Sequence, residues 1–267
     1  AYQDALAGLR QAIGLLYAAA QELGRKDPGS SAHQQLLYET AWCCRSLAED
    51  EIDAARRQIQ EAAVQKLRQK LPQGAPAPAV PGVAISQLPV QPSETTARLL
   101  YERLLAAAPN SELAARARLE LADMLASRPD HADDVASAAK CLAEALTKGP
   151  DLAQTEQISL RLAACLLAGG DADGALARLA TVGAKPVNPN TPARAAYLAG
   201  EALLLKKQPG KAVEQLKAFR DNGQYHNLPN LSDRAMLRLG QALAAGGQHE
   251  PARQAFETLI QRYPASP

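Results

Sequence analysis

The sequence is poor in aromatic residues and carries almost no excess of either charge. Phe, Trp and Tyr together make up 4% of the 267 residues, so bulky side chains are scarce. Because β-sandwiches depend on aromatic and β-branched residues, a core built mainly from Ala and Leu favours close-packed helices. The 29 basic and 28 acidic residues nearly cancel. This balance argues against non-specific nucleic-acid binding and against an acidic disordered tail.

Cysteine and long apolar runs are also scarce. Four cysteines are too few for a disulfide framework. Cys43 and Cys44 are adjacent, and on a helix their side chains would diverge by about 100°, so they should not pair with each other. A bridge between Cys141 and Cys165 is conceivable, but the tendency of Cys to pack as a small hydrophobe favours buried free thiols. No segment approaches the roughly 18 uninterrupted apolar residues of a membrane-spanning helix.

One pattern of residues recurs along the second half of the chain. In its last copy, Leu239-Gly240 is followed by Leu243, and then by Ala252, Phe256 and Pro264. Earlier copies are Leu121-Ala122 with Leu125, Ala138 and Leu142; Leu162-Ala163 with Leu166, Ala175 and Leu179; and Ala199-Gly200 with Leu203, Ala212 and Leu216. The small residue allows two helices to approach closely, the large residues fill the space between them, and Pro ends the second helix. The pattern predicts consecutive helix pairs.

This pattern resembles the tetratricopeptide repeat, in which L-G-x-x-Y, A-x-x-x-F and P follow one another over about 34 residues. The copies in this chain are longer than that period, and their extra residues fall in turns at 127–134, 183–191 and 222–231. The last copy is similar to repeats of bacterial envelope proteins, such as Tol–Pal coordination proteins and outer-membrane assembly lipoproteins. The high Ala content and a Pro-rich insertion also resemble large planctomycete repeat proteins. The resemblance implies an all-α, right-handed α-solenoid with a concave groove that binds peptides or partner helices, and no catalytic activity.

The predicted solenoid covers 93–267, with about four and a half repeats. Ala97, Tyr101, Leu104 and Pro109 copy the second helix of a repeat. Before them, 72–92 contains six prolines and no charged residue, which predicts an extended linker. The alternative is a strap held along the array by its apolar residues, Val83, Ile85, Leu88 and Val90.

Residues 1–71 are predicted to form an N-terminal helical extension. Three helices are expected, at 2–23, 33–47 and 49–71, and the acidic run at 49–51 is interpreted as a helix start. Tyr38-x-x-Ala41-Trp42 resembles the first helix of a repeat, so 33–71 is interpreted as a divergent repeat with an overlong second helix. Trp42 is expected to be a packing residue.

The resemblance also implies which residues line the groove, because the first helix of each repeat faces it. Carried onto this chain, the partner-binding positions are Arg116, Leu119, Arg161, Arg194, Tyr197, Glu201, Arg234, Leu237 and Arg238. Chaperone-binding members hold a C-terminal carboxylate with a Lys/Asn clamp, but Asp123 and Glu201 stand at clamp positions here, which disfavours that ligand.

A ladder of three arginines, Arg116, Arg194 and Arg234, predicts a partner segment that is apolar with some acidic residues. The alternative is that these arginines are solvated and pair with Glu120, Asp123 and Glu201.

No motif for chemistry emerges, so no catalytic residue, cofactor or metal site is predicted. The four histidines, His33, His131, His226 and His249, are scattered in or near predicted turns. The sequence therefore predicts a non-catalytic scaffold or adaptor that binds a protein or peptide partner. One alternative is a self-associating segment of a longer array, because the chain ends at 263–267 without a polar capping helix. Another is an α-toroid hydrolase. The resemblance and the missing initial Met favour the periplasm or cell envelope over the cytoplasm.

Overall fold

The regular secondary structure of the protein is helical throughout the part that the structure describes. The computed structural model describes residues 2–72, 80, 82–128, 132–148, 151–182 and 186–264, and every regular element among them is a helix. This confirms the all-α prediction. The chain divides into two compact units, Ala1–Asp134 and Val135–Pro267. Each is described by itself below.

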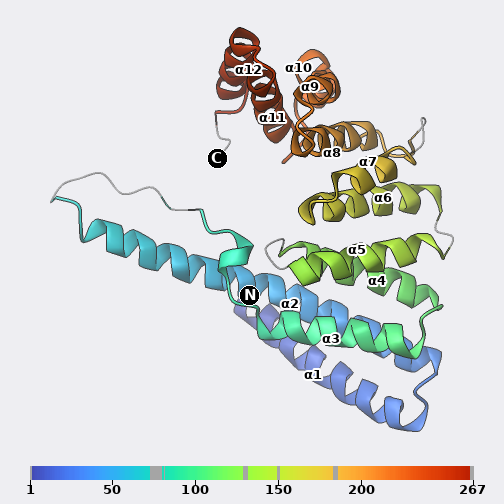
Figure 1. Cartoon of the computed structure of the whole chain (residues 1–267). Helices are drawn as coiled ribbons and strands as arrows, with labels where there is room; N and C mark the ends of the chain where they lie inside the picture. Colours follow the sequence, from blue (N-terminus) through green and yellow to red (C-terminus); the bar gives the residue numbers. More distant parts are fainter. Residues whose placement is uncertain are drawn as a thin grey trace. The chain divides into compact units, whose positions relative to one another are not determined.

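The first unit is built around one long helix. Its elements are α1 (Tyr2–Lys26), α2 (Ser31–Arg68), the 3-10 turn η1 (Ile85–Gln87), α3 (Pro92–Ala107) and α4 (Glu112–Ala126) (Figure 1). The 38-residue α2 is continuous, so the prediction of separate helices at 33–47 and 49–71 is wrong. No Gly or Pro interrupts this stretch, and the acidic run at 49–51 lies in mid-helix. Ser30 caps the start of the helix instead, because its Oγ accepts a hydrogen bond from the His33 backbone N–H at 3.2 Å.

The core of the first unit lies where α2 packs against both α1 and α3. As predicted, Ala97, Tyr101 and Leu104 of α3 face inward and are fully buried. The Tyr101 ring lies 6.0 Å from that of Tyr38 on α2. Trp42, which was predicted to be a packing residue, is 49% exposed and so is only partly packed.

The described end of the Pro-rich segment is anchored to α3 and α4. Pro76, Pro78 and Pro81 lie outside the described residues, and a 3-10 turn at Ile85–Gln87 corrects the prediction that the whole segment is extended. The Arg128 side chain, from the residues just after α4, is 2% exposed and donates to both carboxylate oxygens of Glu94 at 2.8 Å. It also donates to the carbonyls of Ile85 and Leu88, at 3.1 and 2.8 Å. Arg128 therefore holds this segment against the start of α3.

The second unit consists mainly of consecutive helix pairs. The boundary between the units falls inside α5 (Ala132–Leu146), which belongs to the second unit from Val135 onward. The elements that follow are α6 (Leu152–Ala168), α7 (Ala172–Leu179), α8 (Thr191–Leu205), α9 (Pro209–Leu216), α10 (Ala218–Asp221), the 3-10 turn η2 (Gly223–Tyr225), α11 (Ser232–Ala245) and α12 (His249–Arg262). The pairs α6–α7, α8–α9 and α11–α12 pack internally, and α8 also contacts α6, α7 and α11 (Figure 1). These pairs coincide with the last three predicted repeats. The repeat predicted from Leu121 to Leu142 begins on α4 of the first unit.

Glycine performs the role predicted for it in two of these pairs. A Cβ atom at Gly200 on α8 would lie 2.6 Å from Cγ of Leu216 on α9, and one at Gly240 would overlap the Phe256 ring. Ala212, on the inner face of α9, is also fully buried. The two helices of each pair therefore approach more closely than a side chain at the glycine would allow.

The turns inside the three pairs share one geometry. Gly170, Lys207 and Gly247 have φ values of 83°, 56° and 75°. After each of them, the next backbone N–H bonds back into the last turn of the helix, as from Gln208 to the Leu203 carbonyl at 2.8 Å. This is a Schellman-type helix end, in which glycine is the residue of lowest cost. Lys207 occupies that position in the middle pair.

A buried carboxylate connects successive pairs. Glu156 on α6 is almost fully buried and accepts hydrogen bonds from the backbone N–H of Val187 at 2.7 Å and of Asn188 at 3.4 Å. It also accepts one from the hydroxyl of Thr191 at 3.1 Å. Thr191 is the first residue of α8, so a side chain of one pair fixes the start of the next.

The predicted insertions are partly structured. The stretch at 222–231 contains η2, and the rings of Phe219 and Tyr225 pack at 5.3 Å. Residues 129–131, 149–150, 183–185 and 265–267 lie outside the described residues, and with them His131, Pro150 and parts of the predicted turns and C-terminal end. None of the four cysteines, all of which lie in the described ranges, forms a disulfide, so Cys141 and Cys165 are not bridged. No helix in the described ranges is both long and apolar enough to cross a membrane.

Candidate partner-binding surface

The nine predicted groove residues are distributed over both units. Arg116 and Leu119 lie on α4 of the first unit. The other seven lie in the second unit, with Arg161 on α6; Arg194, Tyr197 and Glu201 on α8; and Arg234, Leu237 and Arg238 on α11. The structure therefore assembles six of them on two helices that contact each other, α8 and α11.

Helical spacing places the α8 residues on one face. Arg194, Tyr197 and Glu201 are three and four residues apart, so their side chains lie one above another. The opposite side of α8 carries Leu203, which is buried, and Ala193 and Gly200 are buried beside the polar face. The apolar residues thus fix the rotation of α8, which leaves Arg194 exposed and keeps Tyr197 and Glu201 partly buried.

An ion pair joins the two helices at this face. The carboxylate of Glu201 on α8 accepts from the guanidinium of Arg238 on α11, and Arg238 also donates to the Gln241 side chain at 2.8 Å. Burial raises the pKa of Tyr197, and Glu201 raises it further, while Arg238 and Arg234 oppose the shift. The phenol therefore stays protonated near neutral pH, beside a positively charged neighbour.

Two arginines remain available at the same face. Arg194 and Arg234 are exposed, and neither forms an ion pair within the part of the chain that the structure describes. Leu237, beside them on α11, is 40% exposed. The surface thus presents two cations, a tyrosine and an apolar side chain. We call Arg194, Tyr197, Arg234 and Leu237 the α8–α11 surface.

The local ion pairs at these positions differ from those that the alternative named. Arg116 pairs with Glu112 at 2.9 Å on the same helix. Glu120 pairs with Arg45 of α2. Glu201 is occupied by Arg238. Of the three arginines in the predicted ladder, Arg194 and Arg234 thus remain as unneutralised charges on the second unit.

The His, Cys, Asp and Glu side chains of the described residues do not assemble a metal site. Among them, no group of three or more His, Cys, Asp or Glu side chains could hold a metal ion. Two of the histidines face carbonyl oxygens, His33 that of Pro28 at 2.8 Å and His226 that of Arg220 at 3.0 Å. These contacts give both rings a structural role.

Comparison with known proteins identifies the last helix pair. The family model described as tetratricopeptide repeat matches residues 234–266, which contain most of α11 and all of α12. No curated protein matches the chain. The repeat recognised from Leu239-Gly240 to Pro264 is therefore confirmed, and the chain contains a tetratricopeptide repeat.

Proposed function

We propose that this tetratricopeptide-repeat chain is a non-catalytic adaptor whose α8–α11 surface binds a segment of a partner protein. Tetratricopeptide repeats suggest protein–protein interaction, and an all-helical repeat fold of this kind is typically non-enzymatic. The observation that carries the proposal is the pair of exposed arginines, Arg194 and Arg234, on adjacent helices with no anionic partner in the described chain.

The chemistry of the surface indicates what the partner segment should contain. A guanidinium binds a carboxylate through two parallel hydrogen bonds, so each free arginine suits an acidic side chain. Leu237 offers apolar contact, and Tyr197 offers a rigid ring with a polar end. We therefore expect a segment with acidic residues spaced to reach both arginines and an apolar residue between them.

The test is affinity capture followed by direct binding. Wild-type protein and the Arg194→Glu/Arg234→Glu variant are used as baits in the native extract, and captured proteins are identified by mass spectrometry. The matched control is Lys140→Glu/Lys211→Glu, which changes the net charge equally at two exposed lysines on α5 and α9. Peptides tiling each captured protein are then titrated by fluorescence anisotropy.

The expected result is a peptide whose affinity falls at least tenfold in the arginine variant and stays unchanged in the lysine control. Far-ultraviolet circular dichroism verifies that both variants fold. Equal affinity for the wild type and the arginine variant contradicts the proposal. An equal loss of peptide affinity in both variants would be an effect of net charge alone, and this result also contradicts the proposal.

Self-association through the last helix is a second candidate, favoured by one observation. Ile260 on α12 is 70% exposed, and stacked repeats bury apolar residues of this kind against a neighbouring repeat. Sedimentation equilibrium should show a concentration-dependent dimer that Ile260→Asp abolishes. A monomer at all concentrations excludes this candidate.

A further inference from the structure

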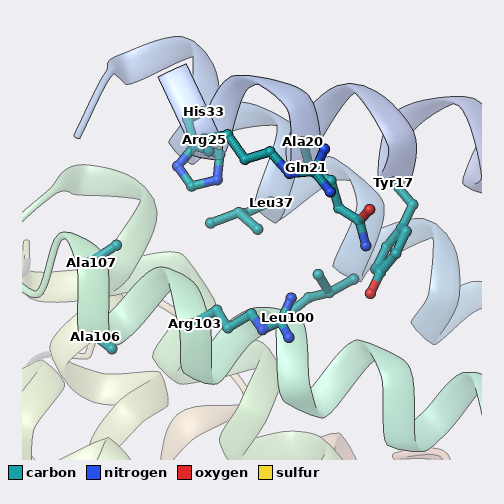
Figure 2. A pocket seen from close by; sticks show the side chains of 11 residues that line it. Tyr17, Ala20, Gln21, Arg25, His33, Leu37, Leu100, Arg103, Ala106 and Ala107 are labelled. Carbon is teal, nitrogen blue, oxygen red and sulfur yellow. The ribbon is translucent and has the colours of Figure 1, made fainter. Parts of the chain in front are cut away.

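A cleft in the first unit has the features of a ligand site, and it is independent of the α8–α11 surface. It has a volume of about 610 Å³ and is lined by residues of α1, α2 and α3 (Figure 2). This volume falls within the roughly 300–1,000 Å³ of small-molecule sites. The cleft lies where α2 packs against both α1 and α3.

Three helical faces supply the lining. Along α1, Tyr17, Gln21 and Arg25 follow one another at intervals of four residues, which places them on one side of that helix. The α2 helix contributes Leu37, and α3 contributes Arg103 with other side chains. The apolar part of the lining consists of Ala20, Leu37, Leu100, Ala106 and Ala107.

The cleft carries positive charge that nothing in it neutralises. Figure 2 shows Arg25 and Arg103 on opposite sides of the cleft, with Leu37 between them. Within the described residues, neither arginine forms an ion pair, and no Asp or Glu lines the cleft. Tyr17 lies at one end of the view and His33 at the other. The ring of His33 is buried and bonded to the Pro28 carbonyl.

We infer that this cleft binds a small anion with an apolar body, of which an alkyl carboxylate is the simplest form. The unneutralised guanidinium groups would hold the acidic head, since charge-assisted hydrogen bonds from Arg to oxyanions are among the strongest in proteins. The alanines and leucines would cover the apolar body. The amide of Gln21 and the hydroxyl of Tyr17 add polar groups that could orient the head.

Calorimetric titration of the full chain tests this inference with three probes: octanoate, octyl phosphate and 1-octanol. Octanoate should bind saturably with one site, and 1-octanol at least tenfold more weakly. The Arg25→Gln/Arg103→Gln variant should lose at least tenfold in octanoate affinity, whereas Arg10→Gln/Lys66→Gln, at exposed positions outside the cleft, should not. Ala107→Trp, which fills space and keeps both charges, should also weaken binding.

The probes separate the two sources of an acidic head. Preference for octanoate assigns the cleft to carboxylates, and preference for octyl phosphate assigns it to phosphate monoesters; either outcome supports an anion site. Equal binding of octanoate by the wild type and the arginine variant overturns the inference. So does equal affinity for octanoate and 1-octanol, or the absence of saturable binding by either anion.

Discussion

Replacing Gly200 with Ala should destabilise the second unit, although alanine is the better helix former. Gly200 lies inside α8, where Ala would gain about 1 kcal/mol in helix propensity. Its Cβ, however, would lie 2.6 Å from Cγ of Leu216. Leu216 is fully buried, so the overlap cannot be relieved by turning a surface side chain. Overpacking of this kind costs up to about 3 kcal/mol, which leaves a net loss of about 2 kcal/mol.

The assay is urea unfolding followed by circular dichroism, with Gly210→Ala as the matched control. Gly210 lies in the first turn of α9 of the same unit, and nothing lies within 4 Å of the position of its Cβ. That variant should be more stable than the wild type by roughly 0.5 kcal/mol. The same chemical change should thus have opposite signs at two positions ten residues apart in one unit.

A double-mutant cycle identifies the cause. Leu216→Ala alone should cost about 2–5 kcal/mol, because it opens a cavity in the core. In Gly200→Ala/Leu216→Ala, the new methyl group no longer meets the leucine and partly fills that cavity. The double variant should therefore be more stable than the sum of the single effects by at least about 0.5 kcal/mol. Strict additivity, or a Gly200→Ala variant as stable as the wild type, would refute the close approach of α8 and α9.

Three further predictions concern single side chains. Arg128→Met should lower the free energy of unfolding of the first unit by about 3–5 kcal/mol, because it leaves the buried Glu94 carboxylate uncompensated; the exposed Arg116→Met control should change it by less than about 1 kcal/mol in the same urea titration. Lys207→Gly should stabilise the second unit by about 1 kcal/mol, since φ at this residue is 56°. Thermal unfolding measures this change, and a lower unfolding temperature in the variant would contradict the turn geometry. Burial raises the pKa of the Cys44 thiol to about 11, so its reactive thiolate is scarce at pH 8 and accumulates only as the pH rises toward that value. Iodoacetamide labelling followed by mass spectrometry should be much slower for Cys44 in the folded chain than in urea at pH 8, and equal rates would refute the burial.

The repeat architecture of the second unit could be predicted because its spacing rules are local. Gly200 and Gly240 each precede their second-helix contacts, Leu216 and Phe256, by sixteen positions in the printed sequence. A small residue in that frame can be recognised without knowing the rest of the chain. The left-handed position at Lys207 was not predictable, because glycine normally marks it.

The first unit was predicted less well, and for a physical reason. The acidic residues at 49–51 suit a helix start, but they suit an exposed mid-helix face equally well. Only the absence of Gly and Pro argued for the continuous α2. Trp42 was expected to pack because Tyr38-x-x-Ala41-Trp42 resembles the first helix of a repeat, yet the rotation of α2 is fixed by Leu37, Ala41 and Cys44, which are buried.

The two candidate sites also differ in how far the sequence could predict them. Arg194 and Arg234 could be proposed from the repeat frame, since it assigns each position a face. Their freedom from ion pairs depends on where Glu201 and Arg238 meet in space, which spacing does not determine. The cleft of the first unit depends on three helices whose mutual packing has no local signal. The spacing of Tyr17, Gln21 and Arg25 along α1 was the one visible trace of it.

The hydrogen bonds of Glu156 determine where this chain could be recombined with other repeat proteins. A chimera joined between α7 and α8 would respect the visible repeat boundary, but it would separate the buried carboxylate from its donors at Val187 and Thr191. An unsatisfied buried carboxylate is strongly destabilising. The transplantable module therefore runs from α6 through the first residue of α8, so that donors and acceptor are inherited together. The module that can be exchanged between repeat proteins is therefore longer than the helix pair that the sequence pattern defines, because it includes the start of the next pair.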